Sequence, residues 1–209
     1  MAAQAGESAQ WATALIHSRA NVSPKRLVDP APDAMQLQAI LEAACAAPDH
    51  GQLRPWRFVL VPTDKRHLLA QAFEEALCER DPHSTAEQRE MAREKAFRAP
   101  VLVLAVVRLG TQADAAQDMA DASVAGTPVH DNERLVTLGC AIQNVLLSAH
   151  AHGFGSGLTS GQAMHSQALR ALFALQAHEQ AVCCINIGTV SKHKPGGERP
   201  GLADILSRL

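Results

Sequence analysis

The chain has 209 residues, a length typical of one domain that buries a substantial core. Its 19 Lys and Arg against 21 Asp and Glu give a net charge of -2, which offers no polybasic surface of the kind that binds nucleic acid or anionic lipid. No signal-peptide pattern opens the chain and no apolar run approaches the roughly 18 residues of a membrane span, so we expect a cytoplasmic protein without nucleic-acid or membrane partners.

The cysteines and histidines suggest no metal site. Five cysteines are scattered at positions 45, 78, 140, 183 and 184 without a Cys-x-x-Cys pair, which argues against both a zinc site and a disulfide framework. We interpret them as small core residues in a reducing compartment. His150 and His152 lie two residues apart on an expected helix, so they point to different faces and cannot share one metal ion.

The first half of the chain alternates helices with strands. Residues 33–47 have the apolar spacing of a helix, with Asp33 as its N-cap and Gln36 in capping-box spacing. A strand is expected at 56–61, where aromatic and β-branched residues are frequent. A second helix should follow, with one apolar face between 68 and 77.

The middle of the chain combines an exposed helix with a buried strand. Residues 84–100 predict a helix with few apolar positions, in which Ser84 and Glu87 have capping-box spacing. Residues 101–107 are apolar at every position, which predicts a central strand buried on both faces. Residues 110–130 show no clear periodicity and could form a lid.

The longest expected helix begins at Asp131 and ends at Gly153, which supplies a C-terminal cap. A glycine-rich segment, a short helix near 166–174 and a buried strand at 181–187 follow, and the tail is weakly helical. The motif GFGSG at 153–157 resembles a dinucleotide-binding fingerprint, but that fingerprint links a strand to a helix, whereas this motif follows a helix. A Rossmann fold is therefore not expected, and the sequence contains no Walker A, Gly-x-Ser-x-Gly or His-Glu-x-x-His motif.

The most polar loop, residues 47–55, lies between the first expected helix and the first expected strand. It places four groups able to hydrogen-bond immediately before Pro-Trp: Asp49, His50, Gln52 and Arg54. Such residues can cap a helix end and solvate a turn, or they can line a binding site. The local sequence leaves both interpretations open.

Four collinear parts of the chain resemble the nitroreductase family, in its small branch. Residues 16–32 and 40–61 resemble the N-terminal block of that branch, in which an Arg-Arg-Ser triplet precedes a basic segment and an Ala-Pro-Asp-His loop precedes Pro-Trp and a strand. Residues 152–161, 185–189 and 198–201 fall where the family has its second flavin-contacting turn, its last core strand and its tail. Collinear matches are more specific than any single motif.

The resemblance implies a fold and a cofactor. The implied fold is α+β, a three-layer α/β/α sandwich with a mixed, mostly antiparallel sheet flanked by helices, formed by residues 1–209 as a single domain. The family has two FMN sites at a homodimer interface and uses NAD(P)H as co-substrate. We therefore expect an FMN-binding homodimer that acts on a small-molecule electron acceptor.

The Arg-Arg-Ser triplet of the family maps onto Arg19, Ala20 and Asn21, where family members hold the FMN phosphate and ribityl chain. Arg19 suits this role because a guanidinium makes forked, charge-assisted hydrogen bonds to phosphate oxygens. Ala20 and Asn21 depart from the family pattern. Losing one cation could weaken FMN affinity, although Lys25 or Arg26 is close enough in sequence to substitute.

Further contacts follow from the same resemblance. His50 is expected to reach the flavin from the partner subunit, with Asp49 as a structural brace of its loop. Arg199 matches an Arg-Pro in the family tail and binds phosphate or is a solvated surface residue. The turn that meets the isoalloxazine edge, where glycines let the backbone approach closely, maps onto Leu158, Thr159 and Ser160.

The implied activity is that of an FMN-dependent oxidoreductase that transfers electrons from NAD(P)H to nitroaromatic, quinone or related acceptors by a ping-pong mechanism. No catalytic acid or base is expected, because the chemistry takes place at N5 of FMN. An alternative is an FMN-binding redox sensor or interaction module without turnover, for which the Ala20 departure leaves room. Ene reduction or substrate dehydrogenation would share every motif quoted.

Overall fold

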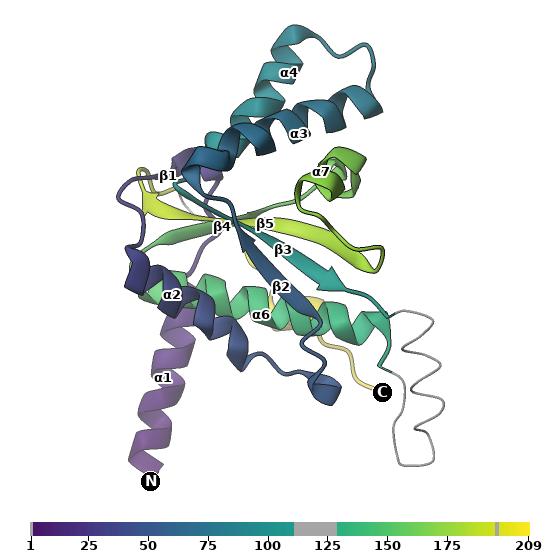
Figure 1. Cartoon of the computed structure of the whole chain (residues 1–209). Helices are drawn as coiled ribbons and strands as arrows, with labels where there is room; N and C mark the ends of the chain where they lie inside the picture. The colour runs from purple at the N-terminus through teal and green to yellow at the C-terminus, as the bar shows by residue number, and fades with distance from the viewer. Residues whose placement is uncertain (1, 111–128, 195–196) are drawn as a thin grey trace, which may run out of the picture.

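An antiparallel sheet separates two layers of helices in the computed structural model, which describes residues 2–110, 129–194 and 197–209 (Figure 1). Most of the segment expected as a lid, residues 110–130, lies outside the described residues. Within them the sheet has five strands: β1 (Leu27–Val28), β2 (Trp56–Leu60), β3 (Val101–Arg108), β4 (Gly155–Thr159) and β5 (Glu179–Val190).

The strand order is β1-β5-β3-β2, and β4 also pairs with β5. All four of these pairings are antiparallel, whereas a parallel contact occurs as an isolated bridge between Asn21 and Ser156. The longest strand, β5, therefore pairs with β1 from the first part of the chain as well as with β3 and β4.

The helices of the described residues cover both faces of the sheet (Figure 1). On one face lie α2 (Ala34–Glu42) and α6 (Asp131–Ala151); on the other lie α3 (Arg66–Arg80), α4 (Ala86–Arg93) and α7 (Gln167–Leu172). The predicted α+β sandwich is confirmed. Because α4 folds back on α3, the two helices form an arm that rises from the sheet, here called the α3–α4 arm.

The core consists of one cluster on each side of the sheet, and β3 contributes to both. Val101, Val103, Ala105 and Val107 pack toward α2 and α6, while Leu102, Leu104 and Val106 pack toward α3 and α7. This alternation is the period of two that a strand imposes on side chains, and it confirms the prediction of a strand buried on both faces.

The cysteines only partly fit the expected core role. Cys183 and Cys184 are buried on opposite faces of β5, and burial raises their pKa values to about 11 and about 12. Cys45 is exposed, so the interpretation of all five as core residues was wrong for this position.

The helix caps test the capping-box predictions. Asp33 accepts a hydrogen bond from the Gln36 N–H at 2.8 Å and its own N–H donates to the Gln36 side chain at 3.0 Å, as predicted. The prediction for the second box was wrong by one residue, because Thr85 and Gln88 form it. Ser84 has the same spacing to Glu87, but it is buried and accepts a hydrogen bond from Arg89.

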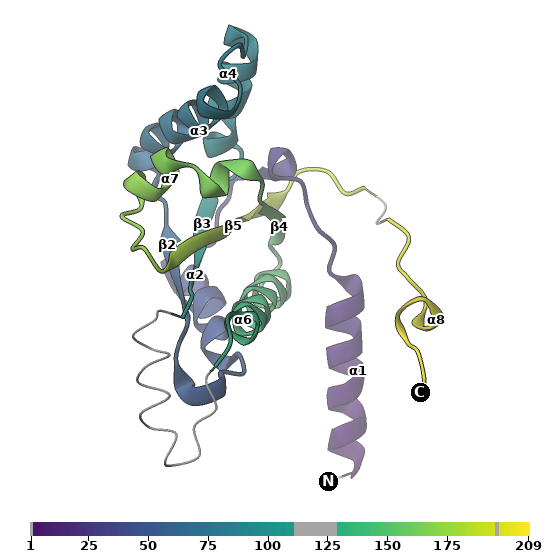
Figure 2. The same cartoon turned by 90° about the vertical axis from the view of Figure 1, so that its right-hand side faces the viewer.

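Two segments stand away from the body of the molecule: helix α1 (Ala2–Ser18) and the C-terminal tail with α8 (Leu202–Ile205) (Figure 2). The Ser18 hydroxyl lies 2.8 Å from Nε2 of His150, near the end of α6. Both segments expose large apolar side chains, namely Trp11, Ile16, Leu202, Ile205 and Leu206. The sequence had not been interpreted as a helix before residue 18.

Candidate functional site

The segment that follows α1 runs beside β4. The Val22 N–H donates to the Ser156 carbonyl at 2.9 Å, and the Asn21 side-chain oxygen accepts from the Leu158 N–H at 3.3 Å. Asn21, which replaces the serine of the family pattern, therefore has a role in this chain: its amide fixes the end of β4 to the N-terminal segment.

Two glycines permit this close contact. A Cβ atom added to Gly157 would overlap the backbone carbonyl of Val22, and one added to Gly155 would overlap the side chains of Leu27 and Val190. No side chain fits at either position without moving the neighbouring segment. The glycine motif thus serves backbone packing, which is consistent with the rejection of a dinucleotide fingerprint.

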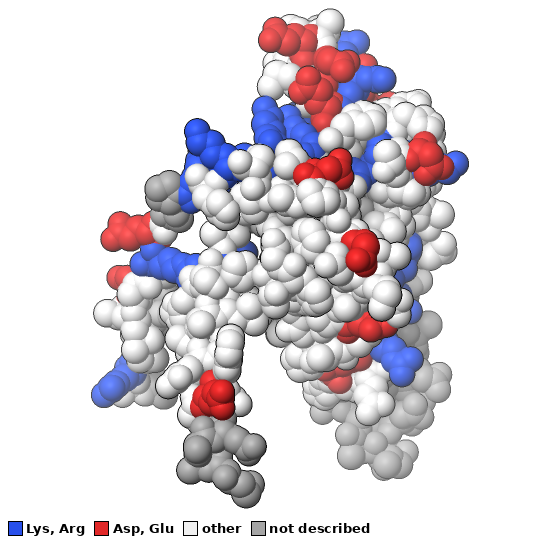
Figure 3. All heavy atoms as spheres, turned by 90° about the vertical axis from the view of Figure 1, so that its left-hand side faces the viewer, with Lys and Arg blue, Asp and Glu red and all other residues white. Residues whose placement is uncertain are grey.

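A basic cavity of about 410 Å³ opens beside this contact. Its wall includes Arg19, Ala20 and Asn21 together with Arg199, whose guanidinium donates to the Arg19 carbonyl at 2.7 Å. The other basic or ionisable side chains of the described wall are Arg26, His193 and Lys194, and no carboxylate is among them. Figure 3 shows basic side chains gathered on the face that carries the N-terminal segment and the tail.

The cavity also indicates which residue can replace the cation of the family pattern that is missing at Ala20. Of the two candidates for replacing it, Arg26 lines the cavity, whereas Lys25 is exposed and is not among the described wall residues. One nitrogen of Arg26 donates to the Lys192 carbonyl at 2.9 Å, which holds the side chain in place. Arg26 is thus the better placed substitute.

A second cavity, of about 470 Å³, lies between the α3–α4 arm and the end of β4. Thr159 and Ser160 line it, whereas Leu158 is exposed and lies outside its wall. The buried amide of Asn186 on β5 lies 3.1 Å from the Thr159 hydroxyl and 3.3 Å from the Gly157 carbonyl, so it anchors this end of β4.

Three cations line the second cavity: Arg80 at the end of α3, and Lys95 and Arg98 in the segment that follows α4. Burial lowers the pKa of Lys95, and the positive charges of Arg98 and Arg80 lower it further. Sequence reasoning missed these residues because the segment was interpreted as a solvated helix. Their joint position depends on the antiparallel packing of α3 on α4, which no local pattern reveals.

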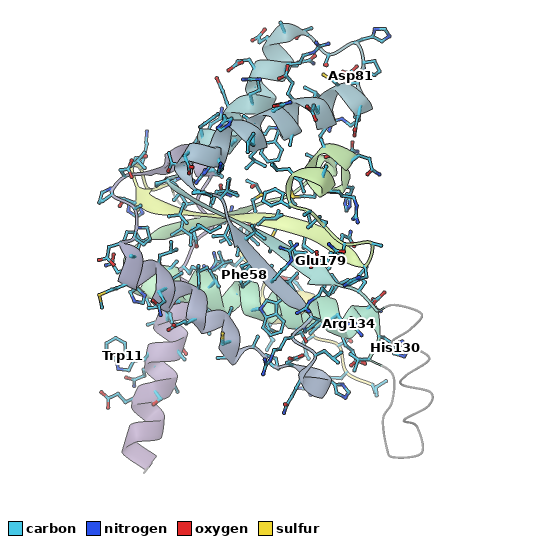
Figure 4. All side chains as sticks on the ribbon, in the orientation of Figure 1. Trp11, Phe58, Asp81, His130, Arg134 and Glu179 are labelled. Carbon is cyan, nitrogen blue, oxygen red and sulfur yellow. The ribbon has the colours of Figure 1, made fainter. Side chains whose placement is uncertain are left out.

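His50 is far from Arg19 within one chain. It is exposed, and its Nδ1 lies 2.8 Å from a carboxylate oxygen of Glu133 in the first turn of α6. Arg19 instead follows Ser18, which contacts His150 in the last turn of the same helix. The spacing from 133 to 150 at about 1.5 Å per residue corresponds to about 25 Å. In Figure 4, Trp11 on α1 and His130 at the start of α6 lie on opposite sides of the molecule.

The backbone of the His50 loop is strained. Gln52 and Arg54 have φ of 53° and 47°, which costs a non-glycine residue on the order of 1 kcal/mol or more. The Asp49 carboxylate accepts a hydrogen bond from the Arg54 N–H at 2.8 Å and so acts as the brace that was expected. Its other oxygen is buried without a hydrogen-bond partner among the described residues.

The two histidines near the end of α6 do not share a ligand site. His150 faces Ser18, whereas Nδ1 of His152 lies 2.8 Å from the Ser148 carbonyl, so the two rings have separate partners. Among the described residues, no three His, Cys, Asp or Glu side chains group together as metal ligands would. None of the helices in these parts of the chain is both long and apolar enough to cross a membrane.

The fold is an α+β sandwich with two cavities beside β4, one of which is lined by basic side chains. The family model that matches is that of the nitroreductase family, over residues 6–189. The chain therefore belongs to the nitroreductase family, as the sequence resemblance implied, and this membership supports an oxidoreductase function.

Relatives and solved structures agree with this assignment. A provisionally named NAD(P)H nitroreductase of Haemophilus influenzae is 32% identical over 168 residues, covering 80% of this chain and 83% of that protein. The provisionally named NAD(P)H nitroreductase YdjA of Escherichia coli is 28% identical over 167 residues, covering 80% and 82%.

Solved structures share the fold at low sequence identity. A nitroreductase-like family protein from Bacillus cereus superposes with a TM-score of 0.77 at 18% identity, covering 94% of this chain and 95% of that chain. A point mutant of NfnB from sphigopyxis sp. strain HMH, described as an FMN and NADPH-dependent nitroreductase, gives a TM-score of 0.68 at 18% identity, covering 94% and 98%.

Proposed function

We propose that the protein is an FMN-dependent oxidoreductase that takes electrons from NADH or NADPH and delivers them to a nitroaromatic, a quinone or a related small acceptor by a ping-pong mechanism. The observation that carries the proposal is the basic cavity, whose wall contains Arg19, Arg26 and Arg199. Beside it, Gly155 and Gly157 of β4 let neighbouring residues approach closely. The neighbouring cavity with Thr159 and Ser160 offers room for a ring system.

The residues present fit an FMN molecule. Guanidinium groups bind phosphate through charge-assisted hydrogen bonds, and Arg19, Arg26 and Arg199 would hold the FMN phosphate in the basic cavity. Asn21, in the wall of the basic cavity, binds the N–H of Leu158, which precedes Thr159 and Ser160 in the wall of the second cavity. Thr159 and Ser160 would meet the ring. When bound, FMN supplies the hydride-accepting and electron-donating chemistry.

The chain's own contribution is binding, orientation and charge. Asn21 and Asn186 hold β4 from two sides, so that its polar end keeps one position. Lys95 places positive charge in the second cavity, where negative charge on a reduced ring would be stabilised. No side chain needs to act as a catalytic acid or base.

The functional unit in this proposal is a homodimer. The contacts of the His50 loop and of Ser18 with α6 are about 25 Å apart along that helix, so Arg19 and His50 lie near opposite ends of it within one chain. A second copy could supply His50 to the site that holds Arg19. The exposed apolar side chains of α1 and of the tail, including Trp11 at 71% exposure, offer surface for such a partner.

The test begins with the protein as purified. We expect a flavin absorbance spectrum, release of FMN on denaturation, and bleaching of the flavin band on anaerobic addition of NADH or NADPH. Addition of a nitroaromatic or a quinone should then restore the band. A flavin that neither nucleotide bleaches would contradict the enzyme and favour a redox sensor or an interaction module on the same scaffold.

A further inference from the structure

The cavity under the α3–α4 arm is lined by both apolar and basic side chains. The apolar ones are Phe73, Leu77, Met91, Leu102 and Met164. The basic ones are Arg80, Lys95 and Arg98, here called the basic wall. A cavity of about 470 Å³ that combines these two kinds of side chain matches a small ligand with an apolar body and an acidic group.

The three cations lack compensating partners in the described parts of the chain. On the same arm, Arg93 pairs with Glu74 at 2.8 Å and with Glu90 at 3.6 Å, but none of the observed ion pairs includes Arg80, Lys95 or Arg98. Nε of Arg98 is buried without a hydrogen-bond partner. The described wall contains a single carboxylate, that of Asp81, which caps the backbone N–H of His83.

The effect of these cations on one another also indicates that negative charge is missing from the cavity. The pKa of Lys95 is lowered by burial and by the charges of Arg98 and Arg80, so the three groups share one partly desolvated space. Like charges in such a space repel, and an anion among them relieves the repulsion.

Arg66 fixes the backbone that carries two of these cations. It is buried, and its guanidinium donates four hydrogen bonds, to the carbonyls of Val61 at 2.9 Å, Ala96 at 2.7 Å, Ala99 at 3.2 Å and Pro100 at 3.0 Å. Ala96 and Ala99 directly adjoin Lys95 and Arg98. Arg66 therefore fixes the positions of Lys95 and Arg98 relative to the core.

We propose that this basic wall binds a carboxylate of the electron acceptor, so that the acceptor is a nitroaromatic, a quinone or a related compound that also carries an acidic group. The inference rests on the proposed function, since it names the substrate of that same site. The FMN phosphate does not need these cations, because Arg19, Arg26 and Arg199 surround a separate cavity. The other possible source of an anionic group is the 2′-phosphate of NADPH, which the experiment separates from an acceptor carboxylate.

The experiment compares two acceptors of nearly equal size, 4-nitrobenzoate and its neutral methyl ester. We expect a kcat/KM about tenfold higher for the acid, as one charge-assisted hydrogen bond of about 1.5 kcal/mol provides. Arg80→Gln and, independently, Arg98→Gln should remove this preference while the ester retains its kcat/KM. Arg93→Gln, on the same arm but paired with Glu74, is the matched control and should keep the preference.

Each result that would contradict the proposal has its own interpretation. Equal kcat/KM for acid and ester in the unmodified protein overturns the proposal, as does a preference that survives both variants. A rise in KM for NADPH but not for NADH or for the acid would assign the wall to the nucleotide phosphate. Loss of FMN from both variants would assign it to the cofactor.

A direct binding measurement separates this inference from the proposed function. Equilibrium dialysis of 4-nitrobenzoate against the protein as purified needs no turnover, and it should give saturable binding that Arg80→Gln weakens about tenfold. Saturable binding without reduction would contradict the enzyme but support the anion site. Reduction of acceptors without any saturable binding of the acid would contradict the anion site alone.

Discussion

The end of β4 and the His50 loop, which are both proposed to contact the flavin, are constructed in opposite ways. At β4, neighbouring backbone at Gly157 and neighbouring side chains at Gly155 lie so close that neither position accepts a side chain, and two asparagine amides hold the strand. The His50 loop is largely exposed, has two non-glycine residues at positive φ, and is linked to the start of α6 by the hydrogen bond between His50 and Glu133. The first region is formed within one chain, whereas the second has the properties expected of a surface that a partner subunit completes.

The largest effect is expected at β4, the tightly packed region of the two. Gly157→Ala should destabilise the fold by about 3 kcal/mol or more, because its Cβ overlaps the Val22 carbonyl and backbone cannot move as a side chain can. Thermal unfolding and FMN content measure the effect. Gly139→Ala is the control, because nothing lies within 4 Å of its added Cβ and alanine favours a helix. Equal melting temperatures for the two variants would show that β4 is not tightly constrained.

Arg19→Ala tests the basic cavity beside β4. Loss of one charge-assisted phosphate contact should weaken FMN binding by about 1.5 to 3 kcal/mol, with little change in folding, because Arg19 is only partly buried. Titration of the apoprotein with FMN, followed by flavin fluorescence, gives the affinity. Arg89→Ala on the α3–α4 arm, outside both cavities, serves as the control. An unchanged affinity in Arg19→Ala would disprove its assignment.

His50→Ala tests the exposed side of the comparison. The variant alone should bind FMN poorly, but mixing it with Arg19→Ala under mild denaturant should restore about a quarter of the sites, since half of randomly exchanged dimers are mixed and each has one intact site. NAD(P)H oxidation by the mixture is compared with that of each parent. Activity equal to the parents' average, with exchange verified, would show that the two residues do not serve one site from opposite chains.

The smallest expected effect concerns the ion pair between Arg57 and Glu179, next to the His50 loop. Arg57, which follows the loop on β2, binds Glu179 through two hydrogen bonds at 2.7 and 2.8 Å and lowers the pKa of Glu179 from 4.5 to about 2. A lowered carboxyl pKa contributes stability above pH 4.5 that disappears as the pH falls toward 2. Because Arg57 is partly exposed, we expect Glu179→Gln to cost on the order of 1 kcal/mol at pH 7. Urea unfolding at pH 7 and at pH 3 should show the difference between the proteins shrinking at the lower pH.

The sequence was sufficient where a local pattern decides the structure. The uninterrupted apolar run of β3 and the Asp33 cap of α2 each depend on neighbouring residues, and both were predicted correctly. The Thr85 cap was missed because Ser84 offers the same spacing, and burial of Ser84 under Arg89 decides between them. Local spacing cannot contain that tertiary contact.

The site was accessible to sequence reasoning mainly through resemblance. Arg19, Asn21 and Arg199 are brought to one cavity as the family pattern implied, but the pattern could not show that Asn21 would bind the Leu158 N–H. Lys95 and Arg98 had no sequence signal of their own, since a charged helical face is usually solvated. Only the packing of the α3–α4 arm over the end of β4 converts them into a cavity wall.

The pairing of β1 with β5 has a consequence for how the protein is made. Leu27 lies opposite Val190, and the Arg199 guanidinium binds the Arg19 carbonyl, so residues from the first and last parts of the chain meet in the basic cavity. During synthesis from the N-terminus, the glycine-rich end of β4 emerges before its partner β5 does. The basic cavity is therefore completed only after Arg199 has been synthesised, and contacts of such long sequence separation are those that form slowly.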